Sequence, residues 1–172
     1  MGGRAHLTRR FVGSLRPGGP GPAAEAWVAG ILADAELRLW DRLSGPDRRH
    51  AHAVARRVEA ALGPEATREV LAAALLHDIG KVDARLGTYG RVVATLSAAV
   101  AGRETATDWS EGRGFTRRVG LYLRHPELGG DLLELAGSDP LVVAWAREHH
   151  HPPERCSVPG AVAEALRAAD DD

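Results

Sequence analysis

The chain has little of what covalent cross-linking or membrane insertion would require. Its single cysteine, Cys156, cannot form a disulfide within the chain, which favours a reducing compartment. No apolar run approaches the roughly 18 residues that span a bilayer, and the first residues contain no apolar segment of the kind found in secretory signals. The sequence therefore predicts a soluble, cytoplasmic protein with no membrane partner.

An excess of charge of either sign is also absent. The 172 residues include 22 Lys and Arg and 23 Asp and Glu, for a net charge of -1. Long nucleic acids are bound mainly through strongly basic surfaces, so this balance argues against them as partners. The length suits one domain with a hydrophobic core, and the oligomeric state is left open.

Residues 1–22 differ in composition from the remainder of the chain. They carry four arginines and no acidic residue, and they end in the run Pro-Gly-Gly-Pro-Gly-Pro. Proline and glycine interrupt regular elements, so this segment is predicted to be a flexible basic arm. Residues 23–172 are predicted to form a single helical domain.

The apolar residues recur with helical spacing, and no segment alternates with the period of two that marks a strand. The fold class predicted from this pattern is all-α. Helices are expected over residues 23–43, 47–62, 65–78, 91–101, 115–124, 126–136, 140–149 and 159–170, with a polar loop over residues 102–114.

One expected helix ends in two polar residues at the edge of an apolar segment. The run Val70 to Leu76 is almost entirely apolar, and His77 and Asp78 follow it directly. Placing an imidazole and a carboxylate beside a core is costly, but both are metal ligands, and a bound ion would offset that cost. Gly80 is expected to supply the turn that ends this helix.

Further histidines and carboxylates occur along the chain. These are His50, the segment His125-Pro-Glu-Leu-Gly129, the run His149-His150-His151, and Asp170. Helical geometry separates His50 from its neighbour His52, because residues two apart lie about 200° from each other around a helix. His50 lies beside the apolar stripe and is expected to face the interior, whereas His52 is expected to be solvated.

Taken in this order, these motifs resemble the HD-domain superfamily of metal-dependent phosphohydrolases. The His77-Asp78-Ile-Gly-Lys81 segment is the most specific, and the segment beginning at His125 resembles the one that supplies a second-metal histidine in the HD-GYP branch and in HD-type dinucleoside polyphosphate hydrolases. The Gly-Tyr-Pro motif is missing, since prolines 152 and 153 follow the histidine run, so cyclic di-GMP is not implied as the substrate. The resemblance covers roughly residues 47–170 and implies an orthogonal helical bundle.

The resemblance also implies a metal site for one or two divalent transition-metal ions, such as Fe, Mn, Ni, Co or Zn. The expected ligands are His50, His77, Asp78 and Asp170 for the first ion, and His125, His149 and His150 for the second, with Asp78 bridging. Because Asp171 and Asp172 follow Asp170, the identity of the last ligand stays open among neighbouring aspartates.

Two residues are expected to take part directly in the reaction, namely Asp78 and Lys81. Lys81 is the only lysine among the 22 Lys and Arg residues, and its compact charge would suit a phosphate oxygen. The alternative is a solvent-facing lysine. Arg117, Arg118 and Arg124 precede His125, and a solvated basic face is the favoured interpretation for them.

The function implied by the resemblance is metal-dependent hydrolysis of a phosphomonoester or phosphoanhydride of a nucleotide or small metabolite. One alternative is an HD-fold di-iron oxygenase, which has a similar ligand set. Another is a non-catalytic HD module that senses a nucleotide. No Gly-x-Ser-x-Gly, Walker or Cys-x-x-Cys motif points to a different chemistry.

Overall fold

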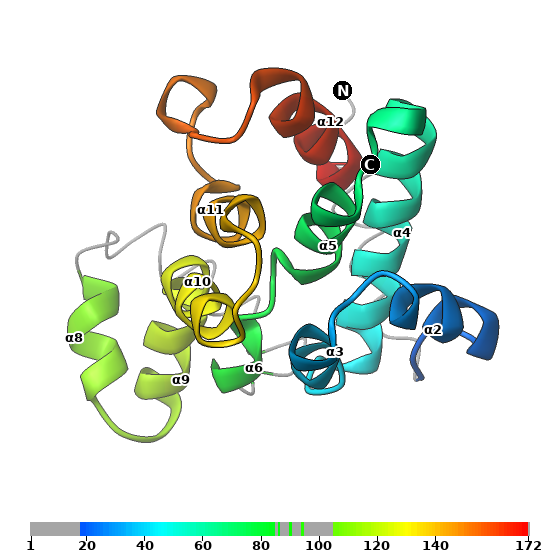
Figure 1. Ribbon diagram of the computed structural model, residues 1–172. Coiled ribbons are helices and arrows are strands. Elements are labelled where there is room, and N and C mark those ends of the chain that lie inside the picture. Colours follow the sequence, from blue (N-terminus) through cyan, green and yellow to red (C-terminus); the bar gives the residue numbers. More distant parts are fainter. Residues whose placement is uncertain (1–17, 85, 87–89, 91–93, 95–104, 172) are drawn as a thin grey trace, which may run out of the picture.

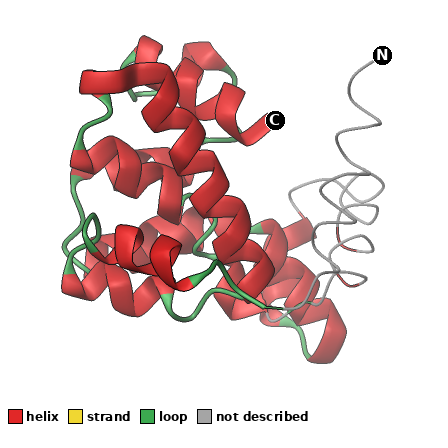
Figure 2. Cartoon of the chain, turned by 90° about the vertical axis from the view of Figure 1, so that its right-hand side faces the viewer, coloured by secondary structure: helices red, strands yellow, loops and turns green. Residues whose placement is uncertain are grey.

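The structure is a computed structural model. It describes residues 18–84, 86, 90, 94 and 105–171. Every regular element among these residues is a helix, as Figure 2 shows, which confirms the predicted all-α class. No helix in this part of the chain is both long and apolar enough to cross a membrane.

Figure 1 shows how the helices of the described residues are arranged. They are α2 (Pro22–Ala29), α3 (Asp34–Trp40), α4 (Gly45–Leu62), α5 (Arg68–Leu76), α6 (Lys81–Ala84), α8 (Thr105–Glu111), α9 (Gly114–Leu123), α10 (His125–Leu135), α11 (Pro140–Glu148) and α12 (Gly160–Asp171). Two short 3-10 turns, Gly63–Glu65 and Pro153–Arg155, lie before α5 and α12.

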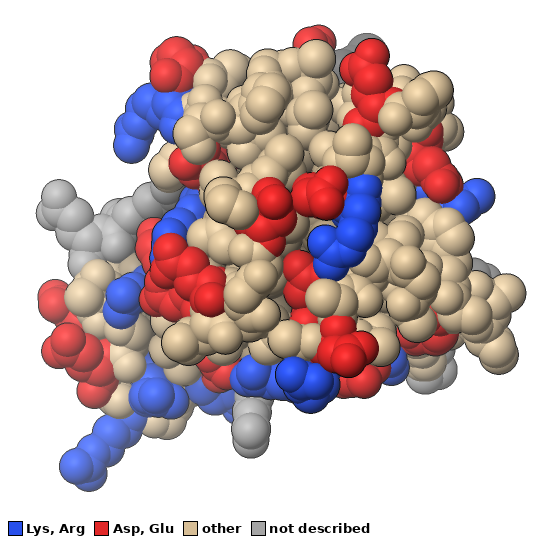
Figure 3. Space-filling model, viewed as in Figure 1, with Lys and Arg blue, Asp and Glu red and all other residues tan. Residues whose placement is uncertain are grey.

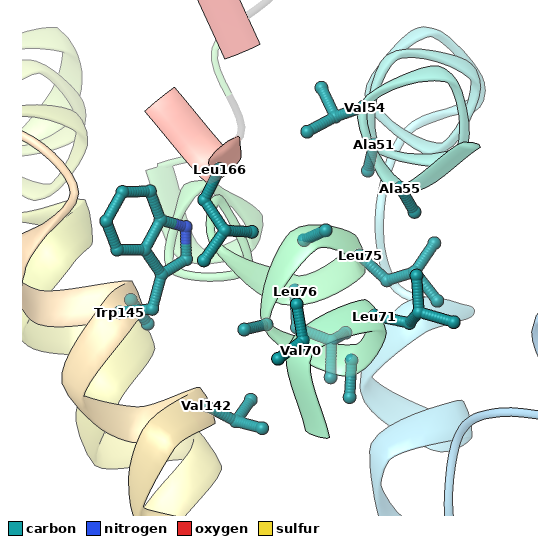
Figure 4. Close-up of a cluster of buried hydrophobic side chains, with 14 of the residues drawn as sticks. Ala51, Val54, Ala55, Val70, Leu71, Leu75, Leu76, Val142, Trp145 and Leu166 are labelled. Carbon is teal, nitrogen blue, oxygen red and sulfur yellow. The ribbon is translucent and has the colours of Figure 1, made fainter. Parts of the chain in front are cut away.

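Helix α5 forms the centre of the main core. All residues from Val70 to Leu76 are buried, as the uniformly apolar sequence predicts for a helix that is covered on every side. Figure 4 shows Trp145 of α11, Leu166 of α12 and Val54 of α4 around it. The position of the polar residues that follow α5 is therefore set by packing on several sides.

A smaller apolar cluster lies beside the main core. Val119 of α9 packs there with Ala84 of α6, and Trp109 of α8 packs against them. Helix α10 contacts α6, α9 and α11, so it connects this cluster with the main core. On the face shown in Figure 3, acidic and basic side chains are interspersed, in keeping with the net charge of -1.

The N-terminal helix predicted over residues 23–43 is wrong, because the structure contains α2 and α3 instead. The carboxylate of Glu36 accepts a hydrogen bond from the backbone N–H of Ala33 at 2.8 Å. Such a bond satisfies a donor at the start of a helix and favours a new helix there. The apolar stripe conceals this break, because its spacing continues across it.

The polar loop predicted over residues 102–114 is also wrong, because it contains α8. Trp109 packs against the smaller apolar cluster, and this burial stabilises a helix that the polar sequence did not predict. Of the helix predicted over residues 91–101, only Ala94 is among the described residues.

Most of the predicted basic arm, residues 1–17, lies outside the described residues, and Pro22 already belongs to α2. The residues between them lie against the start of α4. A Cβ atom on Gly45 would come within 2.5 Å of the Gly18 carbonyl oxygen. The side chain of Ser44 accepts from the N–H of Asp47, so α4 begins two residues earlier than the sequence predicted.

Candidate metal centre

The residues predicted as metal ligands come from five helices and meet at one place. His50 lies on α4, His77 and Asp78 follow α5, and Asp170 is in the last turn of α12. His125 begins α10, and His149 and His150 follow α11. Each of these positions is at or near a helix end except that of His50, which lies inside α4.

Four of the seven residues form the first cluster. His50 Nε2 is 2.9 Å from Asp170 Oδ1. His77 Nε2 is 3.4 Å from Asp78 Oδ2 and 3.7 Å from Asp170 Oδ1. The first cluster therefore joins α4, α5 and α12 through two imidazoles and two carboxylates, and among the aspartates near the last ligand position it is Asp170 that meets the histidines.

The second cluster consists of His125, His149 and His150. One ligand atom from each lies within 4.8 Å of the others. His125 Nε2 is 3.3 Å from Asp78 Oδ1, and His149 Nε2 is 3.8 Å from the same oxygen. Asp78 thus presents Oδ1 to the second cluster and Oδ2 to the first.

Three of the histidines are held in one tautomer by their own helix ends. His77, His125 and His149 each direct Nδ1 at a backbone carbonyl three residues earlier, at 2.9, 2.7 and 2.9 Å. A carbonyl oxygen only accepts hydrogen bonds, so Nδ1 carries a proton, and Nε2 of the neutral ring presents a lone pair. All three Nε2 atoms are buried, and no group in the described part of the chain forms a hydrogen bond with them.

This arrangement fits a bound metal ion. Metal-bound histidines commonly donate their other ring N–H to a backbone carbonyl, which orients the ring. Bonds of about 2.0–2.2 Å to nitrogen and oxygen ligands place neighbouring ligand atoms roughly 3.0–3.5 Å apart. The 3.3, 3.4, 3.7 and 3.8 Å separations around Asp78 and His77 are close to that spacing.

The family of the chain follows from its match to the HD-domain family model, which covers residues 49–171. This range includes every member of both clusters, from His50 to Asp170. The chain belongs to the HD-domain family. Comparisons with curated proteins and with solved structures gave no match.

Membership of this family places the HD domain in a superfamily of metal-dependent hydrolases that bind divalent metals. The two clusters are where this HD domain could hold such ions. A metal ion bound by the three unpartnered Nε2 atoms would offset the cost of placing these histidines beside an apolar core.

The electrostatics favour the charged form of Asp78 and the neutral forms of His149 and His150. Burial alone would lower the pKa of His77, but Asp78 outweighs burial and raises it. Burial alone would raise the pKa of Asp78, but Lys81 and His77 hold it well below its usual range. Burial, followed by the neighbouring His77, lowers the pKa of His149 to about 2, and burial together with His125 lowers the pKa of His150 to about 4. Asp78 is therefore charged and both histidines are neutral near neutral pH.

Lys81 contacts Asp78 directly in this HD domain, which contradicts the solvent-facing alternative. Its Nζ lies against Asp78 Oδ2 and 5.8 Å from the centre of the Tyr122 ring, and only 13 % of its side chain is exposed. Burial alone would lower the pKa of Lys81, but Asp78 outweighs burial and raises it. A positive charge is therefore fixed beside the clusters.

Gly80 does not act as the left-handed helix stop that the sequence predicted, because its φ is not among the positive values of the described glycines. It instead allows two segments to approach closely. A Cβ atom on Gly80 would lie 2.0 Å from the His125 carbonyl oxygen and 2.7 Å from the Gly129 backbone nitrogen. The missing side chain lets the start of α10 reach Asp78.

The side chain of His52 points away from the metal clusters, as predicted, but it is partly buried rather than solvated. Its ring packs edge-on against Trp27, with 5.3 Å between the ring centres. Burial is the largest influence on the pKa of His52, and it lowers that pKa. His52 is thus a packing residue away from the HD metal centre.

The sequence interpretation missed Arg57. Its Nε and Nη2 both donate to the carbonyl oxygen of Ala169, at 2.9 and 2.6 Å. Arg57 lies seven positions after His50, so both are on the face of α4 that meets α12. That heptad spacing is the sequence signal that would have indicated it.

The three arginines before His125 have different surroundings. Arg117 and Arg118 are exposed, as predicted, and Arg118 also donates to the Ala84 carbonyl at 3.0 Å. Arg124 donates to the Ser110 hydroxyl at 3.1 Å and is partly buried. The solvated interpretation therefore holds for Arg117 and Arg118 but not for Arg124.

Proposed function

We propose that this HD domain is a metal-dependent phosphohydrolase that acts on a phosphomonoester or phosphoanhydride of a nucleotide or another small metabolite. The observation that carries the proposal is the convergence of three buried Nε2 atoms and two carboxylates beside the only lysine. This set supplies ligands for cations and a fixed positive charge, and both suit an anionic phosphoryl group.

His50, His77, Asp78 and Asp170 would hold one ion, and His125, His149 and His150 would hold a second. Asp78 would contribute to both, since its two oxygens face different clusters. When bound, the ions supply an activated water at neutral pH and polarise the phosphoryl group. The backbone carbonyls that accept from Nδ1 keep the three histidine rings aimed at the same place.

Lys81 would compensate negative charge on the phosphate group of the substrate. Its ammonium group lies beside Asp78 and is mostly shielded from water, so its attraction for a phosphate oxygen is screened less than at the surface. As negative charge develops on the transferred group, a cation that is already in place stabilises it without reorganisation.

The experiment combines metal analysis with a substrate screen. The purified protein is loaded with Mn, Fe, Co, Ni or Zn, its metal content is measured, and phosphate release is followed on a panel of phosphorylated metabolites. We expect one or two ions per chain and turnover of at least one compound. His77→Ala and Asp78→Ala should abolish both, whereas His52→Ala, the matched control on the outer side of α4, should change neither.

Two results would overturn the proposal. Product formation that requires both iron and dioxygen would identify an oxygenase instead. Tight nucleotide binding with no turnover under any metal would identify a sensing module.

The number of ions is tested separately through the second cluster. His125→Ala and His149→Ala should each reduce the metal content from two ions per chain toward one, because each removes a ligand of that cluster only. An unchanged metal content in both variants would limit the site to the first cluster.

A further inference from the structure

A cavity of about 280 Å³ adjoins the second cluster. His150 belongs to both, since it lines the cavity and is one of the three clustered histidines. The other walls include Arg124, Glu127, Arg147, Thr107 and Leu123, which come from the segment around α8 to α11. A group bound in this cavity would therefore lie next to the proposed site of hydrolysis.

Arg124 is held in place in this cavity by a neutral partner. It lies between α9 and α10, and its Nη1 donates to the Ser110 hydroxyl of α8 at 3.1 Å. That hydroxyl in turn donates to the Thr107 carbonyl at 2.7 Å, which fixes its direction. Ser110 is neutral, and no carboxylate in the described part of the chain lies within ion-pair distance of Arg124.

Arg147 is a wall of the cavity rather than a free cation. Its guanidinium group donates to Asp131 at 2.8 Å and to Glu134 at 2.9 and 3.1 Å. Its stem lies across Gly130, where a Cβ atom would come within 2.4 Å of it. The two carboxylates compensate its charge, so it has little left for a ligand.

Besides the two arginines, the ionisable groups of the lining are His150, His151 and Glu127. Glu127 is the one acid of the lining and opposes an anion. Guanidinium groups suit phosphate because they present paired donors in one plane.

We propose that this cavity binds a second phosphate group of the substrate, one that is not hydrolysed, and that Arg124 is the residue that selects for it. The proposal rests on the proposed function and narrows its substrate class to compounds with two phosphates. Small-molecule sites commonly measure roughly 300–1,000 Å³, so a cavity of about 280 Å³ suits one compact anionic group rather than a whole nucleoside.

The test measures binding rather than turnover. The full chain, as purified, is titrated in a calorimeter with methylenediphosphonate and with methylphosphonate, which carry two and one phosphonate groups. We expect tighter binding of the first compound. Arg124→Gln should weaken it by roughly 10- to 100-fold, as loss of a charge-assisted hydrogen bond does, and should change binding of methylphosphonate by less than about threefold.

Three further variants sharpen the test. Arg117→Gln removes the same charge from an exposed position on α9 and should leave both affinities unchanged. Arg124→Lys should recover only part of the loss, since it keeps the charge without the paired donors. Glu127→Gln should tighten binding of methylenediphosphonate, because it removes the opposing acid. Its effect is independent of any damage caused at Arg124.

Two sources of the second phosphate are distinguished by a third compound. Propane-1,3-bisphosphonate separates its two groups, so preference for methylenediphosphonate indicates a phosphoanhydride and the opposite preference indicates a bisphosphate. Either preference supports the proposal, provided that the preference depends on Arg124.

The proposal is overturned if Arg124→Gln weakens both phosphonates equally or neither of them. The experiment distinguishes failure of this inference from failure of the proposed function. A chain that binds methylenediphosphonate through Arg124 but hydrolyses nothing would support this inference while overturning the phosphohydrolase.

Discussion

Gly80 illustrates how a single missing side chain positions a whole site. The backbone after Asp78 lies so close to the start of α10 that a Cβ atom would meet the His125 carbonyl oxygen and the Gly129 nitrogen. Both of these are backbone atoms, so neither can rotate away. The close approach is what brings His125 Nε2 to 3.3 Å from Asp78.

We expect Gly80→Ala to displace α10 and to impair the second cluster. Overpacking of this kind costs about 1–3 kcal/mol or more of unfolding free energy, which denaturant titration can measure. Metal content should fall toward one ion per chain. Gly160→Ala is the matched control, because a Cβ atom there meets nothing within 4 Å, and a Gly80→Ala variant of normal stability and metal content would contradict the expectation.

Lys81 permits a second test at the scale of one residue. Lys81→Ala should lower kcat by roughly 10- to 1,000-fold, as removal of a group that stabilises transition-state charge does, and should leave metal content unchanged. Lys81→Arg should recover only part of the rate, because the broader guanidinium cannot occupy the same position beside Asp78. Metal analysis and steady-state kinetics on the same preparations check both statements.

At the residue scale, the sequence predicted the identities of the clustered residues well. Their apolar surroundings and helical angles indicated His50 and not His52, and the structure places His50 at the cluster and His52 against Trp27. The role of Gly80 could not be predicted, because the approach of α10 depends on tertiary packing. Arg124 could not be assigned either, since its partner Ser110 belongs to a segment that the sequence predicted to be a loop.

At the scale of elements, the pairing of α4 with α12 is what positions Asp170 beside His50. Helix α4 contacts α12 twice along one face, through His50 to Asp170 and through Arg57 to the carbonyl of Ala169. The second contact satisfies a carbonyl in the last turn of α12. Arg57 is thus a positioning residue for the turn that carries Asp170.

We expect Arg57→Gln to weaken metal binding by roughly 10- to 100-fold, the usual effect of losing a group that orients a ligand. Competition with a fluorescent chelator measures this affinity. Arg56→Gln, a change at the neighbouring exposed position that pairs with Glu59 at 2.7 Å, should leave the affinity unaltered. A purely structural role for Arg57 would instead lower the melting temperature and leave the metal affinity as it was.

The errors in element prediction have the same physical origin. The stripe that predicts one helix over residues 23–43 continues across a break that a long-range contact stabilises, since Arg68 of α5 pairs with Glu36 of α3 at 2.7 Å. Helix α8 depends on burial of Trp109 against residues that are distant in the sequence. Local patterns identify buried helices such as α5, but breaks and polar helices depend on partners elsewhere in the chain.

At the scale of the whole molecule, the clusters join the ends of helices that pack in different places. Ligands that bind only the folded chain raise its stability by an amount that grows with the logarithm of their concentration relative to Kd. At a metal concentration of about 100 times Kd this contribution is roughly 2.7 kcal/mol, which corresponds to about 5–11 °C for a chain of this size.

We therefore expect saturating metal to raise the Tm by about that amount and a chelator to reverse the change. Differential scanning calorimetry measures both. His77→Ala should show no such shift, whatever its own Tm, because it removes a central ligand of the first cluster. An equal shift in that variant would mean that the ion binds elsewhere.

The burial of α5 has a consequence for motion. Amide groups in a helix that is covered on every side exchange with solvent only when the molecule opens globally, whereas exposed helix ends exchange through local fraying. His77 and Asp78 are attached to the first kind of element, with 2 % and 9 % of their side chains exposed, and Asp170 belongs to the second, with 23 %. Hydrogen exchange should therefore be slowest in α5 and faster at the end of α12, so Asp170 belongs to the part of the site that opens first.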